Sequence, residues 1–188
     1  MARPLDENKR TAILAATTAL IAERGLGAST AEIAKLAQIP HGSVFTYFGT
    51  KVDLFNALYV ELKSELAQAI MEHMPTEADA PGQFGHLWAV WVNWGVDNSS
   101  KRRALAQLSL SEDITDLTRK AVAEVSGPAV DVVRRLQMEG ALKSVPSAYI
   151  GALVDTMAGT TIDFIAKRPG DADAVRAAGL EVLVRALK

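Results

Sequence analysis

Residues Thr30 to Leu54, TAEIAKLAQIPHGSVFTYFGTKVDL, contain two short helical patterns that three residues separate. The first pattern spans residues 30 to 37 and the second spans residues 41 to 48. Isolated helices shorter than about 12 residues are marginal in water, so packing must hold both segments in place. Two short helices joined by such a turn are typical of the helix-turn-helix motif, in which the second helix enters the major groove of DNA.

Helical periodicity extends along the whole chain, and no segment shows the alternation of a strand, so we predict an all-α fold of nine or ten helices. We expect a first helix from Asp6 or Asn8 to Arg24, and Thr30 as the cap of the second helix. Thr50 and Asp53 are expected to start a long connecting helix at about residues 51–74. Four of the later helices are predicted at residues 84–96, 100–110, 147–168 and 171–187. Between the second and the third of these, a helical segment is expected to start from a cap at Ser111 and to be interrupted at Gly127 and Pro128.

This pattern predicts a three-helix DNA-binding domain at residues 1–50 and a helical domain at residues 51–188. The first 51 residues contain six basic and four acidic side chains, whereas the remainder has a net charge of −4. A mildly basic N-terminal segment followed by an acidic remainder suits a protein that binds an anion at one end only. The chain has no cysteine, secretory signal pattern or long apolar run, so we expect a cytoplasmic protein that does not associate with a membrane.

The sequence gives no sign of an enzyme. Only three histidines occur, at unrelated spacings, and no glycine-rich phosphate loop is present. We therefore expect no catalytic residue, no metal site and no cofactor.

The segment from Arg10 to about Leu58 resembles the DNA-binding domain of the TetR family of bacterial transcriptional regulators. The resemblance rests on ILAATTALIAERG, TAEIAKLA and HGSVFTYFGTKVDL, in which a glycine, an aromatic pair and a lysine fall at the family's positions. It implies that Thr30, Tyr47 and Lys51 hold DNA phosphates. It also implies base-edge contacts from the predicted third helix, while Gly42 would let the backbone approach a phosphate; the residues expected at base edges are His41, Ser43, Phe45 and Thr46.

Two residues depart from the family's pattern. Gln38 stands where the turn usually has glycine, so it must either adopt the left-handed conformation, at about 1 to 2 kcal/mol, or relax the turn. Pro40 replaces the usual hydroxyl cap, and proline suits a first helical position.

The predicted helix at residues 84–96 contains all three tryptophans of the chain. Aromatic side chains with a few polar groups are typical of a small-molecule pocket, and the resemblance implies an effector there, although a packed core would show the same pattern. Thioether chains adapt to irregular ligands, which adds methionines to the candidates. The candidate pocket residues are Met71, Phe84, Trp88, Trp91, Asn93, Met138 and Met157.

The last two predicted helices carry small residues that permit close helix approach, and two copies would build a four-helix bundle. The residues expected at this homodimer interface are Gly151, Val154, Ala158, Gly159, Leu180 and Leu183. Together these features predict a repressor that a small apolar or aromatic effector releases from a near-palindromic double-stranded operator. The alternative is a helical carrier or sensor of small molecules that no longer binds DNA.

Overall fold

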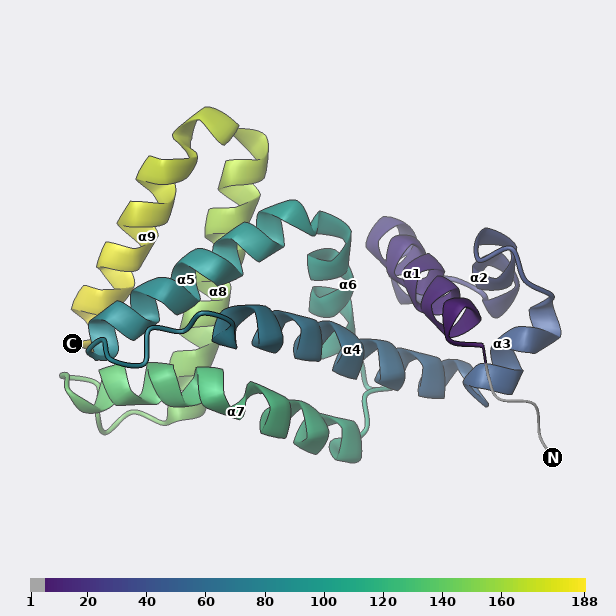
Figure 1. The fold of residues 1–188 in the computed structure, drawn as a ribbon, viewed down its shortest axis with the longest axis horizontal. Helices are drawn as coiled ribbons and strands as arrows, with labels where there is room; N and C mark the ends of the chain where they lie inside the picture. Colours follow the sequence, from purple (N-terminus) through teal and green to yellow (C-terminus); the bar gives the residue numbers. More distant parts are fainter. Residues whose placement is uncertain (1–5) are drawn as a thin grey trace. The chain divides into compact units, whose positions relative to one another are not determined.

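A computed structural model describes residues 6–188, and within that range it contains helices and no strand, which confirms the predicted all-α class (Figure 1). The α-helices are α1 (Glu7–Arg24), α2 (Thr30–Leu36), α3 (His41–Tyr47), α4 (Lys51–Met71), α5 (Ala80–Asp97), α6 (Ser99–Ser109), α7 (Asp116–Met138), α8 (Ser147–Lys167) and α9 (Ala172–Leu187). Two short 3-10 helices, η1 (Gly25–Gly27) and η2 (Pro169–Asp171), precede α2 and α9. None of the helices within residues 6–188 has the length and apolar character that a bilayer crossing requires.

The chain divides into two compact units. Unit 1 comprises Met1–Ser64 and Ser99–Glu124, and unit 2 comprises Glu65–Asn98 and Val125–Lys188. Both α4 and α7 therefore contribute residues to each unit. The functional division expected from the sequence, at residues 50 and 51, stays a prediction.

In unit 1, α1 begins and ends where the sequence predicts. The Asp6 side chain accepts a hydrogen bond from the Asn8 N–H, and Gly25 adopts a φ of 75° after the helix. A buried face of α1 packs against α2 and α6 (Figure 1). The largest fully buried side chains of unit 1 are Phe55, Ile13, Ile21, Ile33, Leu54, Leu58 and Leu108.

The start of α4 confirms the predicted cap. The Thr50 hydroxyl accepts from the Asp53 N–H at 3.0 Å, and the Asp53 carboxylate accepts from the Thr50 N–H at 3.0 Å. This reciprocal pair satisfies two N–H groups that have no partner inside the helix. The helix ends at Met71, slightly before the predicted Met74, and His73 follows with a φ of 58°.

The predicted interruption at Gly127 and Pro128 is wrong, because α7 runs without a break from Asp116 to Met138. A proline inside a helix removes one hydrogen bond and crowds the carbonyl four residues earlier. Here Val122 and Val132 are buried on either side of Pro128, so packing holds both halves of the helix. Tertiary contacts thus override the local preference of a single residue.

Two predicted helix starts are also wrong. The cap before α7 is Thr115, whose hydroxyl accepts from the Thr118 N–H at 3.2 Å, whereas Ser111 accepts from Asp113 in the preceding loop at 3.1 Å. Helix α5 begins at Ala80 and not at Phe84, because the Asp79 side chain accepts from the Gly82 N–H and a proline follows in the first turn.

In unit 2, α5 lies against α8 and α9, and α8 and α9 are neighbours (Figure 1). Trp88 is 1 % exposed, and its indole N–H donates to the Arg176 carbonyl at 2.9 Å. A Cβ added at Gly179 would lie 2.6 Å from Cζ2 of the Trp88 ring. Glycine at this position therefore lets α9 approach α5 as closely as it does.

Candidate nucleic-acid interface

The turn between α2 and α3 has the geometry of a Schellman motif. The Ile39 N–H donates to the Ala34 carbonyl at 3.0 Å, and the Gln38 N–H donates to the Lys35 carbonyl at 3.2 Å. Gln38 has a φ of 57°, so it adopts the left-handed conformation, which is the first of the two possibilities expected from the sequence. Pro40 precedes α3 with an extended ψ of 139° and, as expected, supplies no side-chain cap.

Helix α3 places an apolar side toward the unit and a polar edge toward solvent. Val44 and Phe48 are buried, as the sequence analysis expects. The exposed residues of α3 are His41, Gly42, Phe45 and Thr46, while Ser43 and Tyr47 are half-buried. Phe45 is 43 % exposed, which is unusual for a phenyl ring and leaves it available for contact.

A hydrogen bond joins the starts of α2 and α3. The Thr30 hydroxyl oxygen lies 3.0 Å from Nε2 of His41. The His41 ring also meets the Phe45 ring edge to face, with 5.5 Å between centroids. These contacts bring together one residue expected to hold phosphate and two expected at base edges.

The other two candidate phosphate residues also anchor the domain. The Tyr47 hydroxyl accepts from the Asp6 N–H at 3.1 Å, which leaves its own O–H free to donate. The Lys51 ammonium donates to the Leu26 carbonyl at 2.8 Å and lies 5.1 Å from the centroid of the Phe55 ring. Two of its three N–H groups remain for another acceptor.

The cap of α2 is Ser29, so the expectation that Thr30 has this role is wrong. The Ser29 hydroxyl accepts from the Glu32 N–H at 3.2 Å, and Glu32 accepts from the Ser29 N–H at 2.9 Å. The bond from the Ser29 backbone holds the pKa of the Glu32 carboxyl below its ordinary value. The sequence carried this signal, because serine followed three residues later by glutamate is a capping box.

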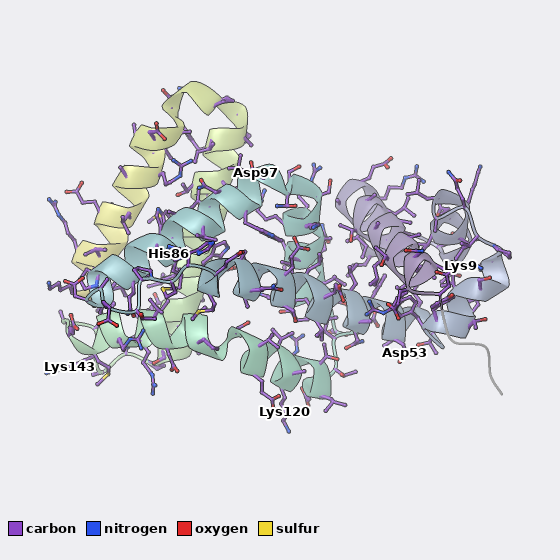
Figure 2. The ribbon with its side chains drawn as sticks, in the orientation of Figure 1. Lys9, Asp53, His86, Asp97, Lys120 and Lys143 are labelled. Carbon is purple, nitrogen blue, oxygen red and sulfur yellow. The ribbon has the colours of Figure 1, made fainter. Side chains whose placement is uncertain are left out.

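Several basic residues of unit 1 are paired. Arg10 lies 3.3 Å from Glu61, and Arg24 lies 2.9 Å from Glu32. Within the part of the chain that the structure describes, Lys9 and Lys35 have no ion-pair partner, and both are exposed (Figure 2 labels Lys9). These two cations remain available to a polyanion.

The structure separates the candidate pocket residues by exposure. Phe84 and Trp88 are buried, and Trp91 and Met157 are half-buried. Met71, Asn93 and Met138 are exposed, so they do not join the buried aromatic side chains. The indole N–H groups of Trp88 and Trp94 have partners within unit 2, and His86, on the same helix, lies 3.1 Å from the Ile70 carbonyl (Figure 2).

The candidate dimer residues divide in the same way. Val154, Ala158 and Leu183 are buried inside unit 2, Gly159 and Leu180 are half-buried, and Gly151 is exposed. Sequence periodicity missed the large apolar side chains that α8 and α9 leave exposed, because it cannot tell which of two apolar faces meets the chain's own core. The exposed large apolar side chains of these helices are Tyr149, Leu153, Phe164 and Val182.

Comparison with known proteins supports the assignment of the N-terminal region. Residues 13–58 match the family model of bacterial regulatory proteins of the tetR family. A transcriptional repressor of Mycobacterium tuberculosis, Rv3405c, is 39% identical over 72 residues, and the match spans 38% of each chain. The chain thus matches well under half the length of this curated relative.

Solved structures share the fold over nearly the whole chain. A tetR family transcription regulator from Shewanella sp. PV-4 superposes with a TM-score of 0.84 at 24% identity, covering 95% of this chain and 97% of that one. The regulator FadR from Bacillus subtilis, solved with stearoyl-CoA, superposes with a TM-score of 0.71 at 17% identity, covering 93% and 97%.

The short pair α2 and α3, with its tight turn and exposed polar edge, defines a helix-turn-helix protein with a larger helical unit. Residues 13–58 are similar to the DNA-binding domain of tetR family regulators, and the fold of the chain is shared with solved regulators of that family. The family and its relatives are transcriptional regulators and not enzymes.

Proposed function

We propose that the protein is a ligand-responsive repressor that binds a near-palindromic operator as a homodimer in the cytoplasm. The observation that carries this proposal is the exposed polar edge of α3, supported from below by buried Val44 and Phe48. A major groove about 12 Å wide accepts one helix, and only its first turns come near base edges. Helix α3 is seven residues long, which suits that role.

In this proposal, Thr30, Tyr47 and Lys51 hold phosphates and fix the register of the protein on DNA. The backbone at Gly42 has open space around it, since an added Cβ would meet nothing within 4 Å. Base edges are contacted from the exposed side of α3 by His41, Ser43, Phe45 and Thr46.

The homodimer is proposed to form through α8 and α9. Their exposed apolar side chains include Tyr149 at 58 % and Val182 at 51 % exposure. Large apolar side chains gathered on two helices favour association with another protein surface. Two copies of α3 about 34 Å apart, one turn of DNA, would read the two halves of the operator.

The helical domain at residues 51–188 is proposed to bind the effector, a small apolar or aromatic molecule. FadR was solved with stearoyl-CoA, whose acyl chain is apolar, and this supports a ligand with an apolar portion for this fold. Trp91 is half-buried, whereas the other two tryptophans are buried and have bonded indole groups, so Trp91 is the best placed of the three to contact a ligand. A hundredfold loss of operator affinity requires only about 2.8 kcal/mol of coupling.

Selection of random duplex DNA with the full chain, followed by a mobility-shift assay, tests the proposal. We expect an enriched sequence with two related half-sites about one helical turn apart. If no sequence is enriched over the starting pool, the repressor proposal fails and the carrier alternative holds. If a sequence is enriched, addition of a long-chain acyl-CoA as a first probe should release the protein from that duplex.

A further inference from the structure

The Thr30 and His41 pair limits which hydrogen bonds the DNA-binding surface can make. Nε2 of His41 lies 3.0 Å from the Thr30 hydroxyl oxygen, and the ring meets Phe45 at 5.5 Å between centroids. Within residues 6–188, Nδ1 of His41 has no hydrogen-bond partner, and the side chain is exposed. The imidazole is therefore held through one nitrogen and keeps the other for a ligand.

The threonine hydroxyl has one hydrogen to donate. If Nε2 of a neutral His41 accepts that hydrogen, Thr30 has none left for a phosphate oxygen. If Nε2 carries a hydrogen of its own, the Thr30 oxygen accepts it and the hydroxyl hydrogen is free for the phosphate. A phosphate contact from the Thr30 hydroxyl thus requires His41 to donate at Nε2.

Two forms of histidine donate at Nε2, and they differ at Nδ1. In the neutral form Nδ1 accepts a hydrogen bond, whereas in the imidazolium both ring nitrogens donate. A phosphate close to the pair favours the positively charged form, and histidine changes charge near neutral pH. In the major groove guanine presents two acceptors, N7 and O6, while cytosine presents an amino donor.

On the basis of the proposed function, we propose that Thr30 and His41 form a relay in which the phosphate contact promotes protonation of His41, and protonated His41 selects guanine through Nδ1. Operator binding then takes up one proton at each half-site. The preference for guanine at the contacted position weakens as the pH rises, because neutral His41 with Nε2–H presents an acceptor to the base.

The charged side chains that the structure describes around His41 do not bond to its ring, so a DNA phosphate would be the anion that acts on it. Helix α2, which packs against α3, carries Glu32 and Lys35. The Glu32 carboxylate already accepts from Ser29 and from Arg24 of α1, next to Glu23, and Lys35 is exposed. On α3 itself the other titratable side chain is Tyr47, whose hydroxyl is bonded to the backbone of Asp6. No carboxylate within residues 6–188 bonds to His41, so the nearest anion in the complex would be the phosphate.

The test measures operator affinity of the full chain by fluorescence anisotropy at constant ionic strength, at about pH 6 and about pH 8. Uptake of one proton by each protomer predicts a loss of affinity with rising pH that approaches about tenfold per pH unit for each of the two half-sites. His41→Asn should remove this dependence, Thr30→Val should weaken it, and Thr30→Ser should retain it. The matched control is His73→Asn, which removes a histidine of unit 2 and suits the φ of 58° there.

A second measurement replaces the guanine that His41 contacts with cytosine in the operator, because adenine also presents an N7 acceptor. The penalty for this replacement should be several times larger at the lower pH for the wild-type chain and equal at both pH values for His41→Asn. Operator binding with the same pH dependence in wild type and His41→Asn would overturn the relay and leave the proposed function standing. Absence of operator binding at every pH would overturn both.

Discussion

The two units of the chain depend on different kinds of contact. In unit 1, polar side chains fix the ends of short helices, as Ser29 does with Glu32 and Lys51 does with the Leu26 carbonyl. In unit 2, α9 approaches α5 so closely that only hydrogen fits at Gly179, and the turn after α7 approaches the end of α9 as closely at Gly140. Each polar bond contributes about 0.5 to 1.5 kcal/mol, whereas an added atom in a close contact disturbs every neighbour at once. Unit 1 should therefore lose stability in small steps and unit 2 in large ones.

The comparison is sharpest at Gly179. We expect Gly179→Ala to lower the free energy of unfolding by about 1 to 2 kcal/mol, because overpacking of about 2 to 3 kcal/mol outweighs a gain of about 1 kcal/mol in helix propensity. The added Cβ would meet the Trp88 ring, which its hydrogen bond to Arg176 holds in place. Chemical denaturation measures the change.

Gly127→Ala is the matched control for this experiment. Gly127 lies inside α7, and an added Cβ there meets nothing within 4 Å. This variant should gain up to about 1 kcal/mol. Equal effects of the two substitutions would contradict the claim that close packing distinguishes unit 2.

The pair in unit 1 that tests the polar side of the comparison is Lys51 with the Leu26 carbonyl. Lys51→Met keeps an apolar chain over Phe55 but loses the hydrogen bond and the charge. We expect a loss of about 1 kcal/mol in stability, and a salt slope of operator binding reduced by about 1 if the ammonium also meets a phosphate. A lower stability with an unchanged slope would restrict Lys51 to the role of an anchor.

The difference between the polar contacts of unit 1 and the close packing of unit 2 explains how much of the structure could be predicted from the sequence. The caps and turns of unit 1 depend on residues three or four positions apart, so the sequence alone predicts the pair of Thr50 and Asp53. The pair of Ser29 and Glu32 has the same spacing, although the sequence analysis expects the cap one residue later, at Thr30. The contacts of unit 2 join residues far apart in the chain. Nothing local to Gly179 indicates that Trp88 lies against it, and nothing local to Pro128 indicates that packing carries α7 through it. For the same reason the candidate pocket residues combine buried and exposed side chains.

Two residues with left-handed backbone, one in each unit, allow a smaller test. Gln38 has a φ of 57° and His73 a φ of 58°. Replacing either by glycine relieves about 1 to 2 kcal/mol of backbone strain but adds up to about 1 kcal/mol of unfolded-state entropy, so we expect a net gain of about 0.5 kcal/mol in each. Melting temperatures of the two variants measure it. A loss in Gln38→Gly alone would mean that the Gln38 side chain supports the turn.

The smallest effect concerns the cap of α2 and depends on pH. The pKa of Glu32 is below its ordinary value of 4.5 because the Ser29 N–H donates to the ionised carboxylate. A carboxyl group with a lowered pKa adds stability above its ordinary value and loses that contribution as the pH falls through the folded-state pKa.

Glu32→Gln keeps a hydrogen-bonding side chain in the capping box but cannot ionise. Its deficit relative to wild type should therefore be present at neutral pH and shrink as the pH falls below 4.5. Thermal unfolding of both proteins across this range provides the measurement, with Glu77→Gln in an exposed loop of unit 2 as the control. If the deficit stayed constant down to acid pH, the ionised form of Glu32 would have no part in holding α2. The polar contacts of unit 1 would then act through geometry alone.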